Sequence, residues 1–483
     1  MSFVRVSSSA IALVIAVLST ACRPAESKPP QVAALETPAK AKATRQVGVT
    51  LDASQTVLAS DKPTELFVRV RVAGLPIARE KRPPINLALV VDTWGSMAGP
   101  AIERAREACS TFADALGEGD TLSIVSFGSK PTILLPARKL DAEARAAARA
   151  AIGSMKAEGT TDMGGGLAAG LNEVSRHLTA EKINRVVLLG DGVPNDPALM
   201  ASLGERARQL GAPITSLGLG VDFDETLMTG LARTSGGAFH FVAEASEVAA
   251  VFEREVSQMQ RLVARGSWVE VTPGPGVTIK EAIGVEASAT GRSMRFSVGD
   301  LSEGQARDAV LRVEVAPRKA DASVELIDAS VHYAHAVAGV ELVETGFLGA
   351  RSSADGGAVT EGKRAEIEHL AARLGVAAGT VRAIALARAG DVRGARALLD
   401  RTTTLATTAA KTFGDDELAK KAAEAKELKK TIASLAPPPE PARVVEGGPH
   451  PAPPRPMMKP VAPEVALSIK NAHGGAMRVL QGM

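Results

Sequence analysis

The sequence predicts an α/β fold: a doubly wound, mostly parallel sheet inserted in a β-sandwich and followed by a small helical region. Three observations predict it. Strand and helix patterns alternate from Ile85 to about Leu262, as in doubly wound sheets. Half-buried alternation of apolar and polar residues flanks this part over residues 46–82 and 263–347. A helical pattern then covers residues 362–435.

The α/β part begins with INLALVV at Ile85, a continuous apolar run typical of a parallel strand buried on both faces. TLSIVSF, RVVLLG, ITSLGLG and AFHFV continue the strands, and TILLPA indicates a short antiparallel edge strand. The stretch AIERAREACSTFADAL has helical spacing and places Cys109 on its apolar face. We therefore expect Cys109 to be a small buried hydrophobic side chain.

The flanking strands are too few on either side to form separate domains. SWVEVTP, MRFSVGDL, AVLRVEVAP and SVELIDASVHYAHAV follow the α/β part, and two strand patterns precede it. We therefore predict that residues 46–82 and 263–347 form one sandwich, with residues 84–262 inserted in it. Beyond the helical region, residues 436–465 are Pro-rich and predicted to be disordered. The weak apolar pattern of residues 466–483 supports no assignment.

The composition limits the classes of protein and partner. With 483 residues and 45% hydrophobic content, the chain can form two to four domains with sizeable cores. Lys and Arg number 56 against 54 Asp and Glu, so no basic surface for nucleic acid is expected. Two cysteines do not make a disulfide framework.

The N-terminus has the pattern of an export signal. Arg5 precedes a short apolar run, Ala10–Leu18, which is too short to span a bilayer, and small residues then lead to Cys22. This resembles a bacterial lipoprotein signal over residues 1–22, although Leu18 lies one place further from the cysteine than usual. The resemblance implies lipidation of Cys22 and a flexible tether over residues 23–45. The alternative is ordinary cleavage near Ala21, and the protein is exported to the cell envelope in either case.

Polar residues follow three strands of the predicted sheet. Asp92, Thr93 and Ser96 follow the first strand. Thr161 lies in EGTTDMGGGL before a helix, and Asp191 follows RVVLLG. Ligands of open α/β sheets bind beyond the carboxyl ends of the strands. Hard oxygen ligands suit Mg²⁺ or Ca²⁺, so the sequence predicts a divalent-cation site at this edge.

At these residues the sequence resembles a von Willebrand factor type A domain, through DTWGSM, GTTDMGGGL and LLGDGVPND in that order over residues 84–262. The resemblance implies a metal-ion-dependent adhesion site and binding of an unidentified protein partner through its acidic side chain. The ligands that it implies are Asp92, Ser96, Thr161 and Asp191. The metal implied is Mg²⁺, with Ca²⁺ and Mn²⁺ as alternatives. The lipoprotein resemblance also bears on location. Arg23 and not Asp follows Cys22, so retention in the inner membrane is not signalled, which implies the outer membrane or the periplasmic face in a Gram-negative cell.

Trp94 stands where the family has the middle serine of its first motif. An indole N–H is a donor only and cannot ligate a cation. Loss of one ligand should weaken metal binding by roughly 10–100-fold. Two interpretations stay open: a weakened metal site, or a metal-free domain that acts as a structural scaffold of an envelope complex. In either case we expect Trp94 to lie outward or grazing, as an anchor for a partner.

The sequence offers no set of catalytic residues. It contains no phosphate loop with Gly-Lys-Ser or Gly-Lys-Thr, and no serine in the context of a nucleophile elbow. His332 and His335 lie three apart in a predicted strand, which directs them to opposite faces and argues against zinc. We therefore expect a binding protein and not an enzyme.

Overall fold

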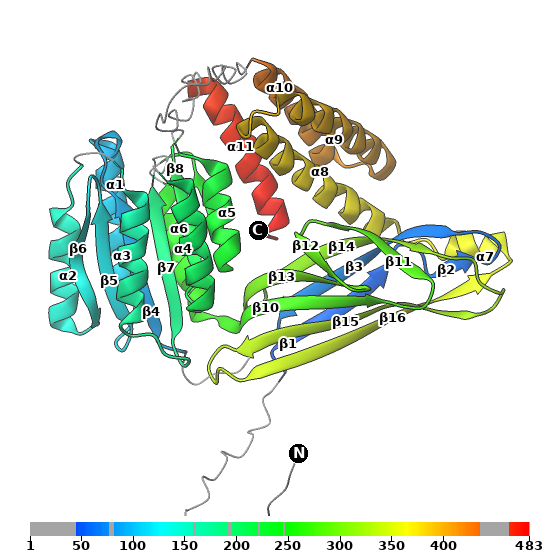
Figure 1. Cartoon of the computed structure of the whole chain (residues 1–483), viewed down its shortest axis with the longest axis horizontal. Coiled ribbons are helices and arrows are strands. Elements are labelled where there is room, and N and C mark those ends of the chain that lie inside the picture. The colour runs from blue at the N-terminus through cyan, green and yellow to red at the C-terminus, as the bar shows by residue number, and fades with distance from the viewer. Residues whose placement is uncertain are drawn as a thin grey trace, which may run out of the picture. The chain divides into compact units, whose positions relative to one another are not determined.

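A computed structural model describes residues 45–76, 82–157, 161–190, 196–220, 223–244, 247–434 and 463–482. All of these belong to one compact unit, Arg45–Met483 (Figure 1). The predicted signal segment with Cys22, most of the tether, most of the Pro-rich segment and Asp191 lie outside the described residues.

The inserted part is the predicted α/β sheet, with strand order β6-β5-β4-β7-β8-β9. All neighbours are parallel except the edge strand β6, which is antiparallel to β5 as TILLPA predicts. Every residue of β4, β5, β7 and β8 is buried, which explains their continuous apolar runs. The strands are β4 (Ile85–Asp92), β5 (Thr121–Phe127), β6 (Pro131–Lys139), β7 (Ile183–Gly190), β8 (Ile214–Leu219) and β9 (Phe239–Val242).

Helices cover both faces of this sheet (Figure 1). Leu87 and Leu89 of β4 pack into one core with α1, α2 and α6, while Ala88 and Val90 pack into the other with α3, α4 and α5. Cys109 is fully buried in the first core, as expected, and burial raises the pKa of its thiol to about 12. The helices are α1 (Pro100–Ala115), α2 (Ala142–Ser154), α3 (Met163–Ser175), α4 (Pro197–Gln209), α5 (Glu225–Ser235) and α6 (Val248–Gln260), with a short 3₁₀ turn η1 (Gly95–Met97).

The strands on either side of the insertion form one sandwich of two sheets, so the predicted fold class is confirmed. β3, before the insertion, pairs with β14, after it, along Thr64–Ala73. Its alternation buries Leu66, Val68, Val70 and Val72 against the second sheet. The four-stranded sheet is β1 (Val47–Ala53), β3 (Thr64–Gly74), β14 (Ala306–Val315) and β11 (Val277–Ile283). The six-stranded sheet is β12 (Ala287–Thr290), β13 (Ser293–Ser302), β10 (Leu262–Pro273), β15 (Ser323–His335), β16 (Glu341–Ser353) and β2 (Val57–Ala59).

The structure extends the predicted sandwich in two places. The short strands β11 and β12 were not expected, and β16 continues to Ser353, beyond the predicted boundary at residue 347. Glycines at 346 and 349 weaken the strand pattern of β16, and its pairing with β15 overrides that local preference.

The helical region also extends further than predicted. Residues 466–483, for which the sequence supported no assignment, contribute most of a helix, α11. The other helices are α7 (Gly356–Glu361), α8 (Ala365–Arg388), α9 (Val392–Phe413), α10 (Asp416–Ala433) and α11 (Pro463–Leu480). Among the described residues α8 is long and apolar enough to cross a membrane, with a mean hydropathy of 1.5, yet half of that window is buried in the protein. A buried core helix meets the same criteria, so this property assigns no membrane span.

Candidate functional site

The first loop of the predicted site starts at the end of β4. Asp92 is fully buried, and its Oδ1 accepts a hydrogen bond from the backbone N–H of Trp94 at 2.9 Å. Such a turn around an aspartate fixes the loop directly after the strand. Thr93 donates from its N–H and its hydroxyl to the carbonyl of Phe127, the last residue of β5, at 2.8 and 3.1 Å. The loop is therefore held against the neighbouring strand end.

The second loop brings Thr161 to the same edge. The backbone N–H of Asp162 donates to the carbonyl of Gly128, directly after β5, at 2.8 Å. The Asp162 side chain caps α3 by accepting from the N–H of Gly165 at 2.9 Å. At Gly166 a Cβ would lie 2.6 Å from the Phe127 ring, so glycine allows α3 to approach β5 closely. Thr161, which is 6% exposed, is thereby buried near the end of β5, the neighbour of β4.

The third loop follows β7, which ends beside Asp92. A Cβ at Gly190 would lie 3.5 Å from Asp92 Oδ2 and 3.2 Å from Met163 Cε. The chain therefore leaves β7 next to the Asp92 carboxylate. Asp191, the next residue and a predicted ligand, lies outside the described residues, as does the side chain of Ser96.

The two predicted ligands whose side chains the structure describes are of the chemical type that binds a hard cation. Asp92 supplies a carboxylate and Thr161 a hydroxyl, from neighbouring strand ends of one sheet edge. In the described part of the chain, no three His, Cys, Asp or Glu side chains gather as a metal site would require. An adhesion site relies on hydroxyls, so this finding does not weigh against one.

Trp94 lies where the sequence predicts, in the loop above the carboxyl end of β4 and immediately before η1. It is partly exposed, with neither a fully buried nor a fully exposed side chain. The indole is therefore accessible from solvent at the edge that carries Asp92 and Thr161.

Comparisons with known proteins identify the class of this domain. Residues 85–241 match the family model of the von Willebrand factor type A domain. The chain therefore contains a von Willebrand factor type A domain, a family of protein-interaction modules that often hold a metal-ion-dependent adhesion site.

Among curated proteins, the uncharacterized protein YfbK of Escherichia coli is 28% identical over 227 residues, which are 46% of this chain and 39% of that protein. The uncharacterized protein sll0103 of Synechocystis is 28% identical over 199 residues, 40% of this chain and 46% of that protein. The chain thus matches less than half the length of these relatives.

Two solved structures resemble this protein over most of the chain. A von Willebrand factor type A protein from Catenulispora acidiphila superposes with a TM-score of 0.62 at 17% identity, and the match covers 89% of this chain and 97% of that chain. The ArnB paralog VWA2 from Sulfolobus acidocaldarius has a TM-score of 0.54 at 17% identity, with 89% and 98% covered. These similarities establish the fold.

A second polar group, which the sequence did not predict, lies at the β8–α5 end of the same sheet. Glu225, the first residue of α5, is 1% exposed. Arg388, the last residue of α8, binds it with two hydrogen bonds of 3.0 and 2.9 Å. Lys470 of α11, also buried, lies 3.1 Å from Glu225 Oε2, and its ammonium donates to the carbonyl of Phe223 as well. We call Glu225, Arg388 and Lys470 the α11 anchor.

In the α11 anchor the carboxylate of Glu225 lies between two cationic side chains. Burial by itself raises the pKa of the Glu225 carboxyl, but the charges of Lys470 and Arg388 outweigh it and hold that pKa below its ordinary value. Burial lowers the pKa of the Lys470 ammonium. One turn along α11, burial lowers the pKa of His473 to about 4, and its ring packs edge-on against Phe239 with centroids 5.6 Å apart. A buried ion pair of this kind is costly to break from one side.

No signal in the sequence could have joined these residues, because Glu225 and Lys470 are 245 positions apart. The one local sign is Lys470 itself, a charge within the apolar pattern of α11.

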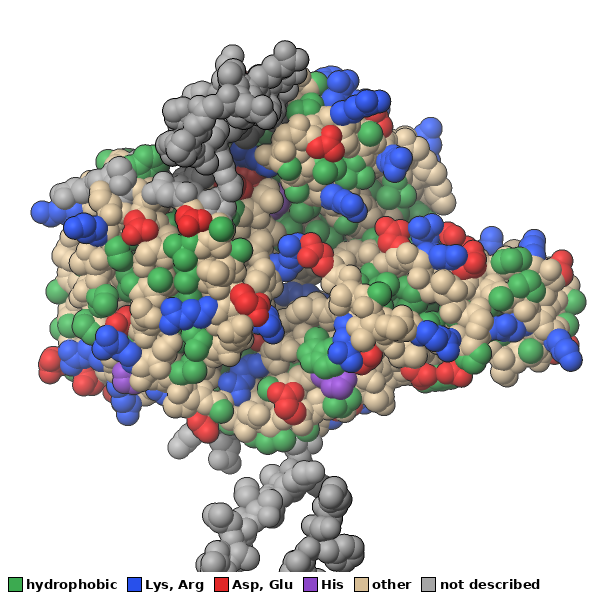
Figure 2. All heavy atoms as spheres, in the orientation of Figure 1, with side chains coloured by type: hydrophobic (Ala, Val, Ile, Leu, Met, Phe, Trp, Pro, Cys, Tyr) green, Lys and Arg blue, Asp and Glu red, His purple; other side chains and the backbone are tan. Residues whose placement is uncertain are grey.

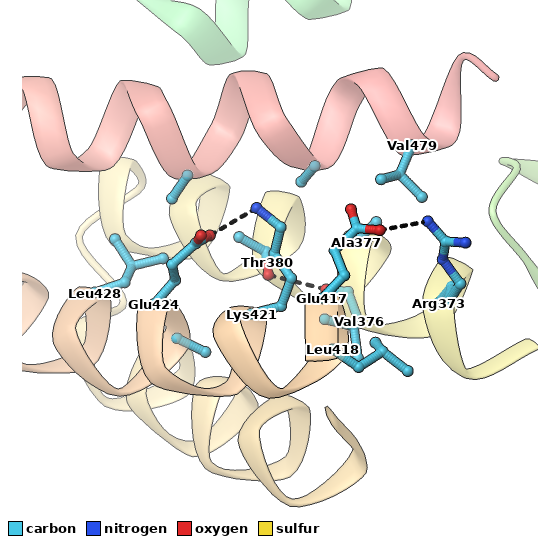
Figure 3. A pocket seen from close by; sticks show the side chains of 13 residues that line it. Arg373, Val376, Ala377, Thr380, Glu417, Leu418, Lys421, Glu424, Leu428 and Val479 are labelled. Atoms are coloured by element: carbon cyan, nitrogen blue, oxygen red, sulfur yellow. Dashed lines mark hydrogen bonds and ion pairs between the residues drawn. The ribbon is translucent and has the colours of Figure 1, made fainter. Parts of the chain in front are cut away.

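The packing beneath α11 forms a narrow groove but no ligand site. Figure 3 shows α8, α10 and α11 around it, with the ion pairs Arg373–Glu417 and Lys421–Glu424 at its rim. Small apolar side chains such as Ala377, together with Leu428, line it, and its cavity volume is about 30 Å³. That volume is far below the range typical of small-molecule sites. The groove is therefore an interface between helices.

Proposed function

We propose that this protein is an exported, lipid-anchored binding module that captures a protein partner on the strand-end edge of its von Willebrand factor type A domain. The observation that carries the proposal is the arrangement at that edge. Asp92 and Thr161 lie buried at neighbouring strand ends, and a partly exposed Trp94 stands beside them. A scarce aromatic side chain at a binding edge suits a hot spot for a partner.

A divalent cation, when bound at such an edge, offers an open coordination position to an acidic side chain of the partner. Asp92 and Thr161 would hold it together with Ser96 and Asp191. Trp94 supplies no ligand oxygen, so we expect Mg²⁺ to bind roughly 10–100-fold more weakly than in a site with a serine there. The indole would then supply part of the contact that the metal provides in relatives.

A metal-free scaffold is the second candidate function. The α11 anchor favours it, because a buried ion pair between helices and the α/β domain serves structure and not capture. Proteins of this family are generally non-enzymatic. Neither candidate includes catalysis.

Magnesium titration by calorimetry of Trp94→Ser, beside the unchanged protein, tests the metal site. The substitution restores a hydroxyl, so binding should tighten by at least about tenfold. Thr161→Ala in the Trp94→Ser background should reverse that gain, whereas Thr179→Ala, in the loop before β7, should not. Equal or weaker Mg²⁺ binding in Trp94→Ser would remove the metal-dependent interpretation and leave the scaffold.

Cell fractionation tests the proposed lipid anchor at Cys22. Two acyl chains on Cys22 would bury many CH₂ groups at about 0.8 kcal/mol each, which is enough for stable membrane attachment. Cys22→Ala should therefore move the protein from the membrane fraction to the soluble exported fraction. Unchanged membrane association would place the anchor elsewhere in the chain.

A further inference from the structure

One strand of the sandwich has a long open edge. β16 pairs with β15 along Glu341–Arg351, but on its other side only Arg351–Ser353 pair, with β2. In the part of the chain that the structure describes, residues 341–350 of β16 therefore have one hydrogen-bonded strand neighbour, although β1 packs against their inner face. Figure 1 shows β15 and β16 as a long hairpin. Alternate backbone N–H and C=O groups along this stretch face away from β15 and can accept another strand.

Among the edge strands that the structure describes, β6 carries more of the usual edge protection than β16 does. The edge strand β6 contains Pro131 and Pro136, ends in Arg-Lys, and has two irregularities in its register with β5. Such prolines, charges and bulges are the usual protection of an edge strand. β16 has thirteen residues with neither Pro nor Lys, and its charged residues are Glu341, Glu344 and Arg351, of which Glu344 pairs with Arg45 at 3.1 Å. The short edge strand β9 is partly covered by the Gln481 side chain, whose amide lies 3.2 and 3.3 Å from the carbonyl oxygen and the nitrogen of Phe239.

Exposed apolar side chains gather at the open edge. Phe347 is 63% exposed and Val343 is 52% exposed, both on the outer face of β16. On the inner face, Gly346 lies against Val49 and Leu51 of β1, which stay only half-buried at this seam between the two sheets. Figure 2 shows blue and red side chains interspersed over one face of the molecule, with no large area of a single charge. The feature that distinguishes the β16 edge is therefore its exposed apolar side chains and not a concentration of charge.

The side chains of this stretch are complementary to themselves in one antiparallel register. A twofold axis through Thr345 places Val343 opposite Phe347 of a second copy on the outer face. The same axis places Leu342 opposite Leu348 on the inner face, and a glycine opposite each glutamate. A shift of the axis by one residue toward the N-terminus would instead oppose Glu344 to itself, which like-charge repulsion disfavours. Strand pairing around a twofold axis gives a closed dimer.

We propose that β16 is a dimerisation edge, and that a second copy of this chain pairs with it antiparallel around Thr345 to form a continuous sheet across two sandwiches.

Light scattering after size-exclusion chromatography tests the association, with the full chain carrying Cys22→Ala to remove the lipid site. We expect a dimer at tens of micromolar protein, and at least tenfold weaker association in Phe347→Ser. Leu405→Ser is the matched control, since Leu405 is an exposed apolar residue of α9 at 39% exposure and should leave the dimer unchanged. A monomer at all concentrations up to about 100 micromolar would overturn the proposal.

Disulfide trapping tests the register in the same background. Thr345→Cys should form an intermolecular disulfide on mild oxidation, because residues opposite each other in paired strands have Cβ atoms about 5 Å apart. Glu341→Cys, equally exposed on the same strand, should not, because the two copies of that residue would lie roughly 27 Å apart. Cys109 is buried and does not interfere. A stable dimer without the Thr345 disulfide, or equal trapping at both positions, would overturn pairing through β16.

Discussion

Two carboxylates at the carboxyl end of the same sheet, Asp92 after β4 and Glu225 after β8, have different neighbours. Asp92 is held by the backbone of its own loop and lies beside Thr161 and a partly exposed Trp94. Glu225 is neutralised by Arg388 and Lys470, which come from helices far along the chain. The same rule of topology places both groups at this edge. The difference teaches that the same sheet edge can hold one carboxylate in a loop whose own backbone binds it and another beside cations from distant helices.

The largest expected effect comes from removing the charge of Glu225, the carboxylate that Arg388 and Lys470 bind. Glu225→Gln leaves Lys470 buried beside a neutral partner, which typically costs about 3 kcal/mol or more. We expect amide exchange in α11 to speed up by about 100-fold, measured by hydrogen exchange with mass spectrometry. Glu107→Gln in α1 removes an exposed ion pair and should change nothing. A change in α11 below about fivefold would show that the ion pair does not hold this helix.

Lowering the pH should destabilise the docking of α11 without a mutation. His473 has a pKa of about 4 in the fold and about 6.5 when unfolded. The unfolded chain therefore binds more protons between these pH values, so this contribution is complete above about pH 7 and is lost as the pH falls toward 4. Burial opposes ionisation of Glu225, but the charges of Lys470 and Arg388 hold its pKa below its ordinary value, so Glu225 is not expected to cause a change between pH 7.5 and pH 5.

At pH 5 we expect the opening free energy of α11, from hydrogen exchange, to be about 2 kcal/mol lower than at pH 7.5. His473→Phe retains the edge contact with Phe239 but cannot titrate, so its profile over this range should be flatter. An equal pH dependence in both proteins would assign the effect to other groups.

The smallest expected effect concerns the candidate site around Asp92 and Thr161. Asp162 caps α3 directly after Thr161, and its loss in Asp162→Ala should cost about 1 kcal/mol of local stability. Exchange in the first turn of α3 should rise by about fivefold. Asp224→Ala removes the equivalent cap of α5 and serves as the counterpart, since there the α11 anchor still holds the helix. If Asp224→Ala increased exchange in α5 more than Asp162→Ala does in α3, the α11 anchor would not be the dominant constraint on α5.

Much of the fold could be predicted because its patterns are strong and local. The continuous apolar run of β4 and the alternation in β3 each have the periodicity of the strand they form. The loops of the candidate site were predicted for a similar reason, since topology alone brings the ends of parallel strands to one edge. The structure adds the hydrogen bonds of Thr93 and Asp162 to the residues at the end of β5.

Two of the elements that escaped prediction, β16 and α11, have residues that contradict a simple pattern. β16 carries two glycines and exposes Phe347, so its strand state depends on β15. α11 contains adjacent glycines and a lysine among apolar residues. A Cβ at Gly474 would lie 2.9 Å from Phe241, so this glycine serves close packing against β9, which no local pattern reveals.

The sequence by itself determined the class of fold, the insertion of the α/β domain between strands of a sandwich, and the loops that carry Asp92, Trp94 and Thr161. Periodicity and strand order suffice for these, because they depend on each element's own apolar pattern. Only the tertiary structure decided which carboxylate meets a cation, which edge strand stays open, and where α11 docks. These depend on residues hundreds of positions apart, such as Glu225 and Lys470, whose attraction becomes strong only once folding removes them from water.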